Sequence, residues 1–187
     1  IHGGGLDLKF PHHECEVAQG TACNGVAPVK YWMHANMLTM NGLRMSKSTG
    51  NYILPMELLE SKNDFFEKEF NPSVVRFCFM QAHYRGVLDI SNEAMLASEK
   101  GYNRLMEAIT LLSKIEINAT SSVDIATWKK ACYDAMNDDF NTTILMAQLF
   151  EAVRIINLLN DKKETISETD LTELKTTLES FVFDVLG

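Results

Sequence analysis

The residue types best suited to metal binding lie one helical turn apart near the start of the chain. Pro11 can open a helix, and His12 and Glu16, four positions apart, would then project from one face of it. An imidazole and a carboxylate on one face suit zinc, with further ligands supplied from elsewhere. A solvated pair on an exposed helix is the alternative. Cys15 lies on the same side, but adjacent residues rarely bind one ion, so we interpret it as a neighbour of the site.

A glycine run precedes this pair. Gly3, Gly4 and Gly5 carry no Cβ, so their backbone amides can approach a phosphate or a sugar closely. Asp7 follows at a distance from which it can accept hydrogen bonds from a ribose. The alternative is a plain glycine turn that ends a strand.

A second candidate site is the polar loop at 43–51, which reads LRMSKSTGN. Ser46 and Ser48 flank Lys47 in this glycine-containing loop. Such a loop can fold over a triphosphate, where Lys47 would neutralise the charge that develops as pyrophosphate departs. A solvated surface loop is again the alternative.

The elements that position these residues belong to two regions with different sequence patterns. Residues 1–70 read as a compact α/β or irregular region, in which 31–40 is a short strand or buried segment and Asn41-Gly42 is a tight turn. Residues 71–187 read as an α-helical bundle, so the chain is predominantly helical overall. We expect helices to begin at Pro55, Asn71-Pro72, Ser91 and Asn141, and a further helix that carries Ile125 to follow a loop at 117–122.

One helix of the bundle has a clear apolar stripe. Its members recur at helical spacing and need a complementary apolar face, which the last helix offers. The stripe comprises Leu145, Leu149, Val153, Ile156 and Leu159, and the facing residues are Leu171, Leu174, Leu178 and Phe181.

Composition narrows the class of protein. The 187 residues are 46% hydrophobic and 22% charged, which is typical of a globular protein, and no apolar run approaches the roughly 18–20 residues of a membrane span. The net charge of −8 argues against broad, charge-driven nucleic-acid binding. An acidic total does not exclude a local basic patch. The four cysteines form no CxxC pair, which favours a reducing cytoplasm. Because the chain begins with Ile1, we expect that its N-terminus has been cut away.

Taken together, the motifs resemble one enzyme family. The pentapeptide at 44–48 resembles the KMSKS signature of class I aminoacyl-tRNA synthetases. The segment HGGGLDLKFPHHECEVAQ at 2–19 is similar to one that usually reads HGGGxDLxFPHHENExAQ in cysteinyl-tRNA synthetases. Tyr31-Trp32-Met33-His34, midway between the two motifs, fits that family. The segments at 76–80, 83–85 and 138–142 resemble its helical stem-contact bundle.

The resemblance implies a fold and a reaction. Residues 1–70 would be the C-terminal portion of a Rossmann-like catalytic domain with its KMSKS loop, and 71–187 a stem-contact and DALR-like bundle. The parent would be a cytoplasmic, monomeric ligase of protein biosynthesis without a membrane partner. It would use ATP to convert L-cysteine to cysteinyl-adenylate and transfer the cysteinyl group to tRNA(Cys).

The resemblance also assigns roles to residues. Lys47 would be catalytic and would bind ATP with Ser46 and Ser48, while Gly3, Gly4, Gly5 and Asp7 would lie on the adenosine side. His12 and Glu16 would bind one zinc ion, whose two further ligands lie outside this chain. Because that zinc binds the substrate thiolate, a hydroxyl in its place would be a much poorer ligand, so serine would be rejected.

Three departures from the family pattern accompany this interpretation. Arg44 replaces the first lysine of KMSKS, Cys15 stands where asparagine is usual, and the HIGH motif is absent. We therefore expect the isolated chain to be inactive. Two alternatives stay open: the cysteine ligase of mycothiol biosynthesis, and a non-catalytic helical module that binds tRNA or a partner.

Overall fold

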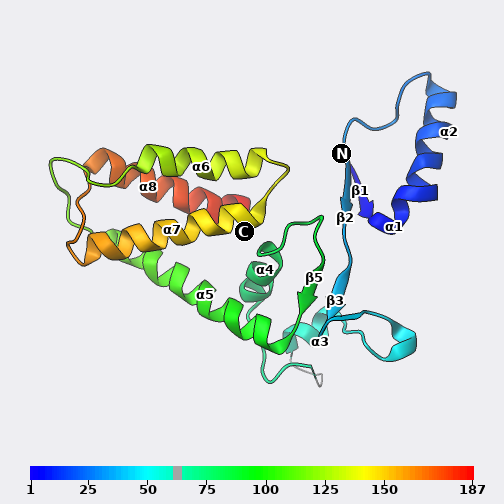
Figure 1. Ribbon diagram of the computed structural model, residues 1–187, viewed down its shortest axis with the longest axis horizontal. Helices are drawn as coiled ribbons and strands as arrows, with labels where there is room; N and C mark the ends of the chain where they lie inside the picture. Colours follow the sequence, from blue (N-terminus) through cyan, green and yellow to red (C-terminus); the bar gives the residue numbers. More distant parts are fainter. Residues whose placement is uncertain (61–64) are drawn as a thin grey trace. The chain divides into compact units, whose positions relative to one another are not determined.

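The computed structural model describes residues 1–60 and 65–187, and these form two compact units (Figure 1). The first unit comprises 1–54 and 82–91, and the second comprises 55–81 and 92–187. The helical unit is therefore interrupted by a segment that belongs to the first unit. The sequence suggests a single boundary at residue 70, where helical patterns begin. Such a boundary does not account for 82–91, which belongs to the first unit.

The first unit begins with a strand–helix–strand crossover. Strand β1 (His2–Gly5) pairs in parallel with β2 (Trp32–Ala35). Between them lie the short helix α1 (Leu6–Leu8), the irregular turn η1 (Lys9–His13) and helix α2 (Glu14–Asn24). Parallel strands need such a crossover, and it brings the carboxyl ends of both strands to the same edge.

A second sheet completes this unit. Strand β3 (Leu38–Met40) pairs antiparallel with β4 (Leu43–Arg44) and in parallel with β5 (Leu88–Ile90), in the order β4-β3-β5. Asn41 and Gly42, with φ of 51° and 73°, form the predicted tight turn between β3 and β4. The segment 31–40, predicted as one strand or buried segment, contains two separate strands, β2 and β3.

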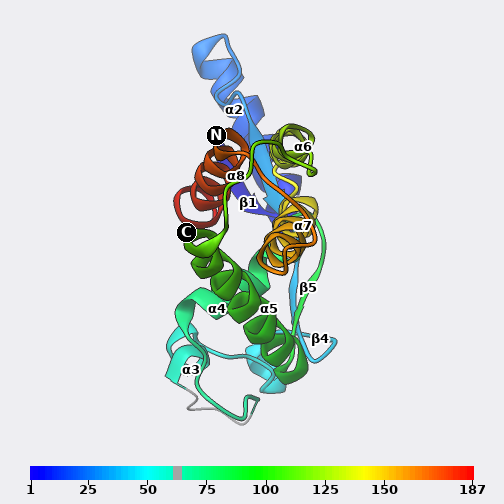
Figure 2. The same cartoon turned by 90° about the vertical axis from the view of Figure 1, so that its left-hand side faces the viewer.

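The second unit is helical, as predicted. Figure 2 views α6, α7 and α8 nearly end-on, arranged around a common core. Its principal helices are α3 (Pro55–Glu60), α4 (Pro72–Met80), α5 (Asn92–Leu111), α6 (Ile125–Asn137), α7 (Thr142–Asn160) and α8 (Glu168–Glu179). Short turns follow two of them, η3 (Leu112–Lys114) and η4 (Ser180–Val185).

N-terminal capping residues and an apolar stripe predicted the positions of these helices correctly. The side chain of Asn71 accepts a hydrogen bond from the backbone N–H of Ser73 at 2.9 Å, and Asn141 caps α7 by accepting from Ile144 at 3.2 Å. Each cap satisfies a donor that the first turn of a helix leaves unpaired. The predicted stripe of α7 is buried at every position. Of the facing residues, Leu174, Leu178 and Phe181 are buried, and Leu171 is half-buried against the same core.

Helix α7 corrects one expectation. Its 19 residues, with a mean hydropathy of 1.4, are long and apolar enough to cross a membrane by length and composition alone, so the expectation that no run reaches that length was wrong. The reason is that two of its faces are apolar: the stripe is joined by Met146, Ala152 and Ile155. All of these side chains are buried in the core of the helical unit.

Candidate active site

The glycine run of β1 permits a close approach by a histidine ring. A Cβ on Gly4 would lie 2.8 Å from Cε1 of His13, so only glycine leaves room for the ring at this point. His13 is buried, whereas its neighbour His12 is exposed. Phe10 has extended backbone (φ −133°, ψ 132°) and helical geometry resumes at Pro11, which confirms the helix predicted to carry 12–16.

His13 is the centre of an aromatic and imidazole cluster. Its Nδ1 lies 2.8 Å from Nε2 of His34, and its ring centroid lies 4.9 Å from that of Trp32 and 4.8 Å from that of His2. Burial, together with the positive charges of His13, Lys9 and Arg85, lowers the pKa of His34. The neutral imidazole is therefore favoured at position 34.

The same cluster contains a set of potential metal ligands. Donor atoms of His2, His13 and Glu16 lie within 4.8 Å of one another, and Nε2 of His2 is 3.3 Å from a carboxylate oxygen of Glu16. Two imidazoles and a carboxylate are donors that zinc accepts. The structure thus brings Glu16 together with His2 and His13, while the predicted ligand His12 lies outside this group.

A cleft of about 510 Å³ opens beside the cluster in the first unit. Basic nitrogens predominate among its polar side chains, and one carboxylate is present. The cleft is lined by Leu6, Lys9, His13, Glu14, Val17, Trp32, His34 and Arg85. The sequence alone favoured a structural or substrate-lining role for His34, and it did not single out His2 or Trp32. The alternation of Trp32 and His34 along β2, which puts both on one face of the strand, is the signal that could have found Trp32.

The Lys47 loop is held closed by its own hydrogen bonds. Ser46 donates its backbone N–H to the carbonyl of Asn51 at 2.9 Å, and the side-chain Nδ2 of Asn51 donates to the carbonyls of Leu43 and Arg44 at 3.2 Å each. The hydroxyls of Ser46 and Ser48 lie 2.7 Å apart. Lys47, at the start of the short turn η2 (Lys47–Thr49), is exposed, so its charge is presented outward from a fixed loop.

Within the described part of the chain, the candidate residues form two groups. In the first group, Gly4 of the Gly3–Gly5 strand and the carboxylate of Glu16 lie close to the ring of His13, and the carboxylate of Asp7 lies against Gly5. The loop with Ser46, Lys47 and Ser48 forms the other group, and its residues are not among those that line the cleft.

Two family models match the chain. A model described as the catalytic domain of class I (C) tRNA synthetases matches residues 1–100. A DALR domain model matches residues 131–187.

Similar proteins have been named in several bacteria. The chain is 51% identical over 189 residues to a protein of Bacteroides thetaiotaomicron named cysteine–tRNA ligase. It is 48% and 38% identical, over 187 residues each, to proteins of the same name from Porphyromonas gingivalis and Chlorobaculum tepidum. Each match covers the whole of this chain, and the chain spans 38%, 38% and 36% of these relatives' lengths.

A solved structure shares the fold. The LeuRS of Agrobacterium radiobacter K84, in its ternary complex with tRNA and LeuAMS, aligns over 99% of this chain and 27% of its own length with a TM-score of 0.59. At 14% sequence identity this likeness concerns the fold alone.

Proposed function

The chain belongs to the family of class I (C) tRNA synthetase catalytic domains, and on this premise we propose that it acts in a cysteine–tRNA ligase. ATP would activate L-cysteine as cysteinyl-adenylate with release of pyrophosphate, and the cysteinyl group would then pass to tRNA(Cys). The observation that carries the proposal is the closed 43–51 loop, which presents Lys47 from a fixed backbone. As a translation enzyme it would work in the cytoplasm.

Lys47 would stabilise the departing pyrophosphate. A preorganised cation at that point counters the charge that builds up in the transition state and needs no rearrangement during the reaction. The hydroxyls of Ser46 and Ser48 would supply hydrogen bonds to the same phosphates. Asn51 supports all three residues indirectly, because its side chain ties the two ends of the loop together.

The other end of ATP would lie at the glycine strand. Gly3, Gly4 and Gly5 offer backbone close to a nucleoside, and Asp7 would accept hydrogen bonds from its ribose. This placement agrees with the general rule that nucleotides bind at the carboxyl ends of parallel strands, since β1 ends at Gly5.

A zinc ion would distinguish cysteine from serine by binding the substrate thiolate. We propose Glu16 and His12 as ligands, in keeping with the family segment that this sequence resembles. The cluster of His2, His13 and Glu16 supports a second set that shares Glu16. Both sets consist of donors that zinc accepts, and both leave a position for another ligand.

The function is tested by replacing the matching segment of the Bacteroides thetaiotaomicron relative with this chain. We expect the chimera to catalyse pyrophosphate exchange that depends on cysteine. Lys47→Ala should lower the rate of that exchange by roughly 10²–10³ while cysteine binding is retained. Lys30→Ala, at another exposed lysine of the first unit, is the matched control and should change neither. A folded chimera without exchange contradicts the function, and an unchanged rate in Lys47→Ala contradicts the role of the loop.

The zinc ligands are tested in the same chimera by measuring metal content and cysteine affinity together. His12→Ala and Glu16→Gln should each reduce both, since the thiolate is held through the metal. Cys15→Asn should leave both nearly unchanged, because Cys15 is exposed and lies outside the ligand group. Loss of zinc in His13→Ala but not in His12→Ala would contradict the proposed pair and assign the site to the cluster.

A further inference from the structure

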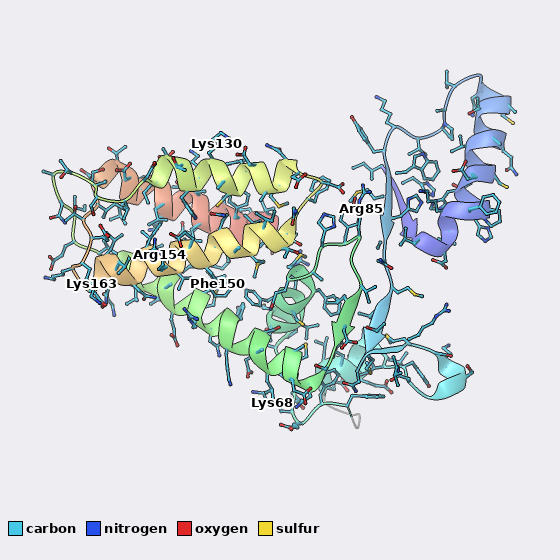
Figure 3. The ribbon with its side chains drawn as sticks, in the orientation of Figure 1. Lys68, Arg85, Lys130, Phe150, Arg154 and Lys163 are labelled. Carbon is cyan, nitrogen blue, oxygen red and sulfur yellow. The ribbon has the colours of Figure 1, made fainter. Side chains whose placement is uncertain are left out.

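Two cations line the cleft of the first unit, and neither has a role in the reaction described above. Lys9 lies in the turn η1 between α1 and α2, and Arg85 lies in the loop before β5, where Figure 3 labels it. The two residues are far apart in the sequence and come to the same cleft through the fold. A shared position reached from two separate segments is a feature that only the structure reveals.

The loop that carries Arg85 is hydrogen-bonded to the segment that links β2 and β3. Asn36 donates its backbone N–H to the carbonyl of Tyr84 at 2.9 Å and its side-chain Nδ2 to the carbonyl of Arg85 at 2.8 Å. Gly86 closes a turn by donating to the carbonyl of His83 at 2.8 Å. The backbone at Arg85 is therefore fixed against the segment that links β2 and β3.

The guanidinium itself is oriented by a neighbour. Nε of Arg85 donates to the hydroxyl of Tyr84 at 3.0 Å, and the guanidinium carbon lies 5.5 Å from the centre of the Tyr84 ring. The side chain also lies at the surface of the unit, where a ligand can reach it. A planar, oriented guanidinium suits bidentate binding of phosphate oxygens.

The charges around the cleft favour an anion. Lys9 and Arg85 supply two positive charges, and Glu14 is the one carboxylate among the lining residues. This surplus stands out in a chain whose net charge is −8.

We propose that Lys9 and Arg85 bind a phosphate ester of a nucleotide substrate in this cleft. The inference rests on the proposed function, because that function supplies two such esters: the α-phosphate of ATP, which becomes the phosphate of the adenylate, and the phosphodiesters of the 3′ end of tRNA. In either case the two cations hold the nucleotide beside the imidazole cluster and the glycine strand.

The experiment uses this chain and three soluble probes. AMP represents the adenylate, the trinucleotide CpCpA represents the tRNA end, and adenosine, which lacks phosphate, is the control ligand. In the unmodified chain, contact is followed by NMR at the Nε–Hε signal of Arg85, and dissociation constants for the chain and all its variants come from titration of the indole N–H signal of Trp32, which lines the same cleft. We expect AMP or CpCpA to shift this signal and adenosine to leave it in place. Arg85→Gln and Lys9→Gln should each weaken binding about tenfold or more, since each removes a charge-assisted contact.

Lys130→Gln is the matched control, because Lys130 lies in the helical unit and pairs with Asp134. It should bind both phosphate probes as the unmodified chain does. A shift with AMP alone identifies the adenylate phosphate, and a shift with CpCpA alone identifies the tRNA end. Equal binding of AMP and adenosine, no binding of either phosphate probe, or undiminished binding in Arg85→Gln and Lys9→Gln would overturn the inference. An active chimera together with undiminished binding removes this inference alone, and an inactive chimera with charge-dependent binding removes the function alone.

Discussion

The thiol groups of the chain fall into two classes, which gives a test at the scale of single residues. Cys15 and Cys23 are exposed on α2, while Cys78 and Cys132 are buried in the helical unit. Burial raises the pKa of Cys78 and raises that of Cys132 to about 12, so both stay protonated and unreactive at neutral pH. We predict that iodoacetamide adds two groups to the native chain within minutes, as measured by mass spectrometry.

The unfolded chain provides the control for this prediction. In guanidinium chloride all four cysteines of the sequence should react, because none then has a protected environment. Peptide mapping should place the native adducts at Cys15 and Cys23. Rapid labelling of Cys132 in the native chain would contradict the burial of α6 against the core.

At the same scale, the histidines show what sequence reasoning can and cannot reach. The spacing of His12 and Glu16 predicted a shared helical face, and the helical backbone there is confirmed. The sequence could not decide which of two adjacent histidines points inward, since that depends on the rotation of the helix against β1. Gly4, which leaves room for the ring of His13, decides it.

At the scale of elements, the stripe of α7 allows a prediction of stability. Leu149 is 0% exposed and belongs to the core cluster of the helical unit. Truncating it to alanine should lower the free energy of unfolding by about 2–5 kcal/mol, because the cavity adds to the lost burial. Urea denaturation followed by circular dichroism measures the change.

Ile144, on the same helix, is the matched control. It is 46% exposed, so Ile144→Ala should change the free energy of unfolding by about 0.5 kcal/mol or less. If both variants lost stability equally, the inward face of α7 would be assigned wrongly.

Helices were easier to predict than strands for a physical reason. A cap or an apolar stripe is written within one segment, as Asn141 and the residues after it illustrate. The pairing of β3 with β5 joins Met40 to Ile90, and no local pattern marks such a distant partner. The cleft shares this property, since Lys9 and Arg85 meet only through the fold.

For the whole molecule, the division into units predicts how the chain can be cut. A chain that starts at Pro55, with 82–91 replaced by a short glycine–serine linker, should remain helical and unfold cooperatively, because its core lies within the helical unit. Starting instead at Asn71 removes the buried Leu58, Phe66 and Phe70 and should lower the midpoint of thermal unfolding. Circular dichroism of the two chains compares them directly. Identical midpoints would show that 55–70 contributes nothing to the helical unit.

The late arrival of β5 also has a consequence for synthesis on the ribosome. The hairpin of β3 and β4 is complete once Arg44 has emerged, but the partner for the other edge of β3 is made about 45 residues later. At translation rates of roughly 5–20 residues per second, that edge stays unpaired for about 2–9 s. An unpaired edge can recruit a foreign strand. The nascent chain therefore passes through an interval in which the free edge of β3 is open to pairing with another strand. The interval ends when Leu88–Ile90 pairs with β3.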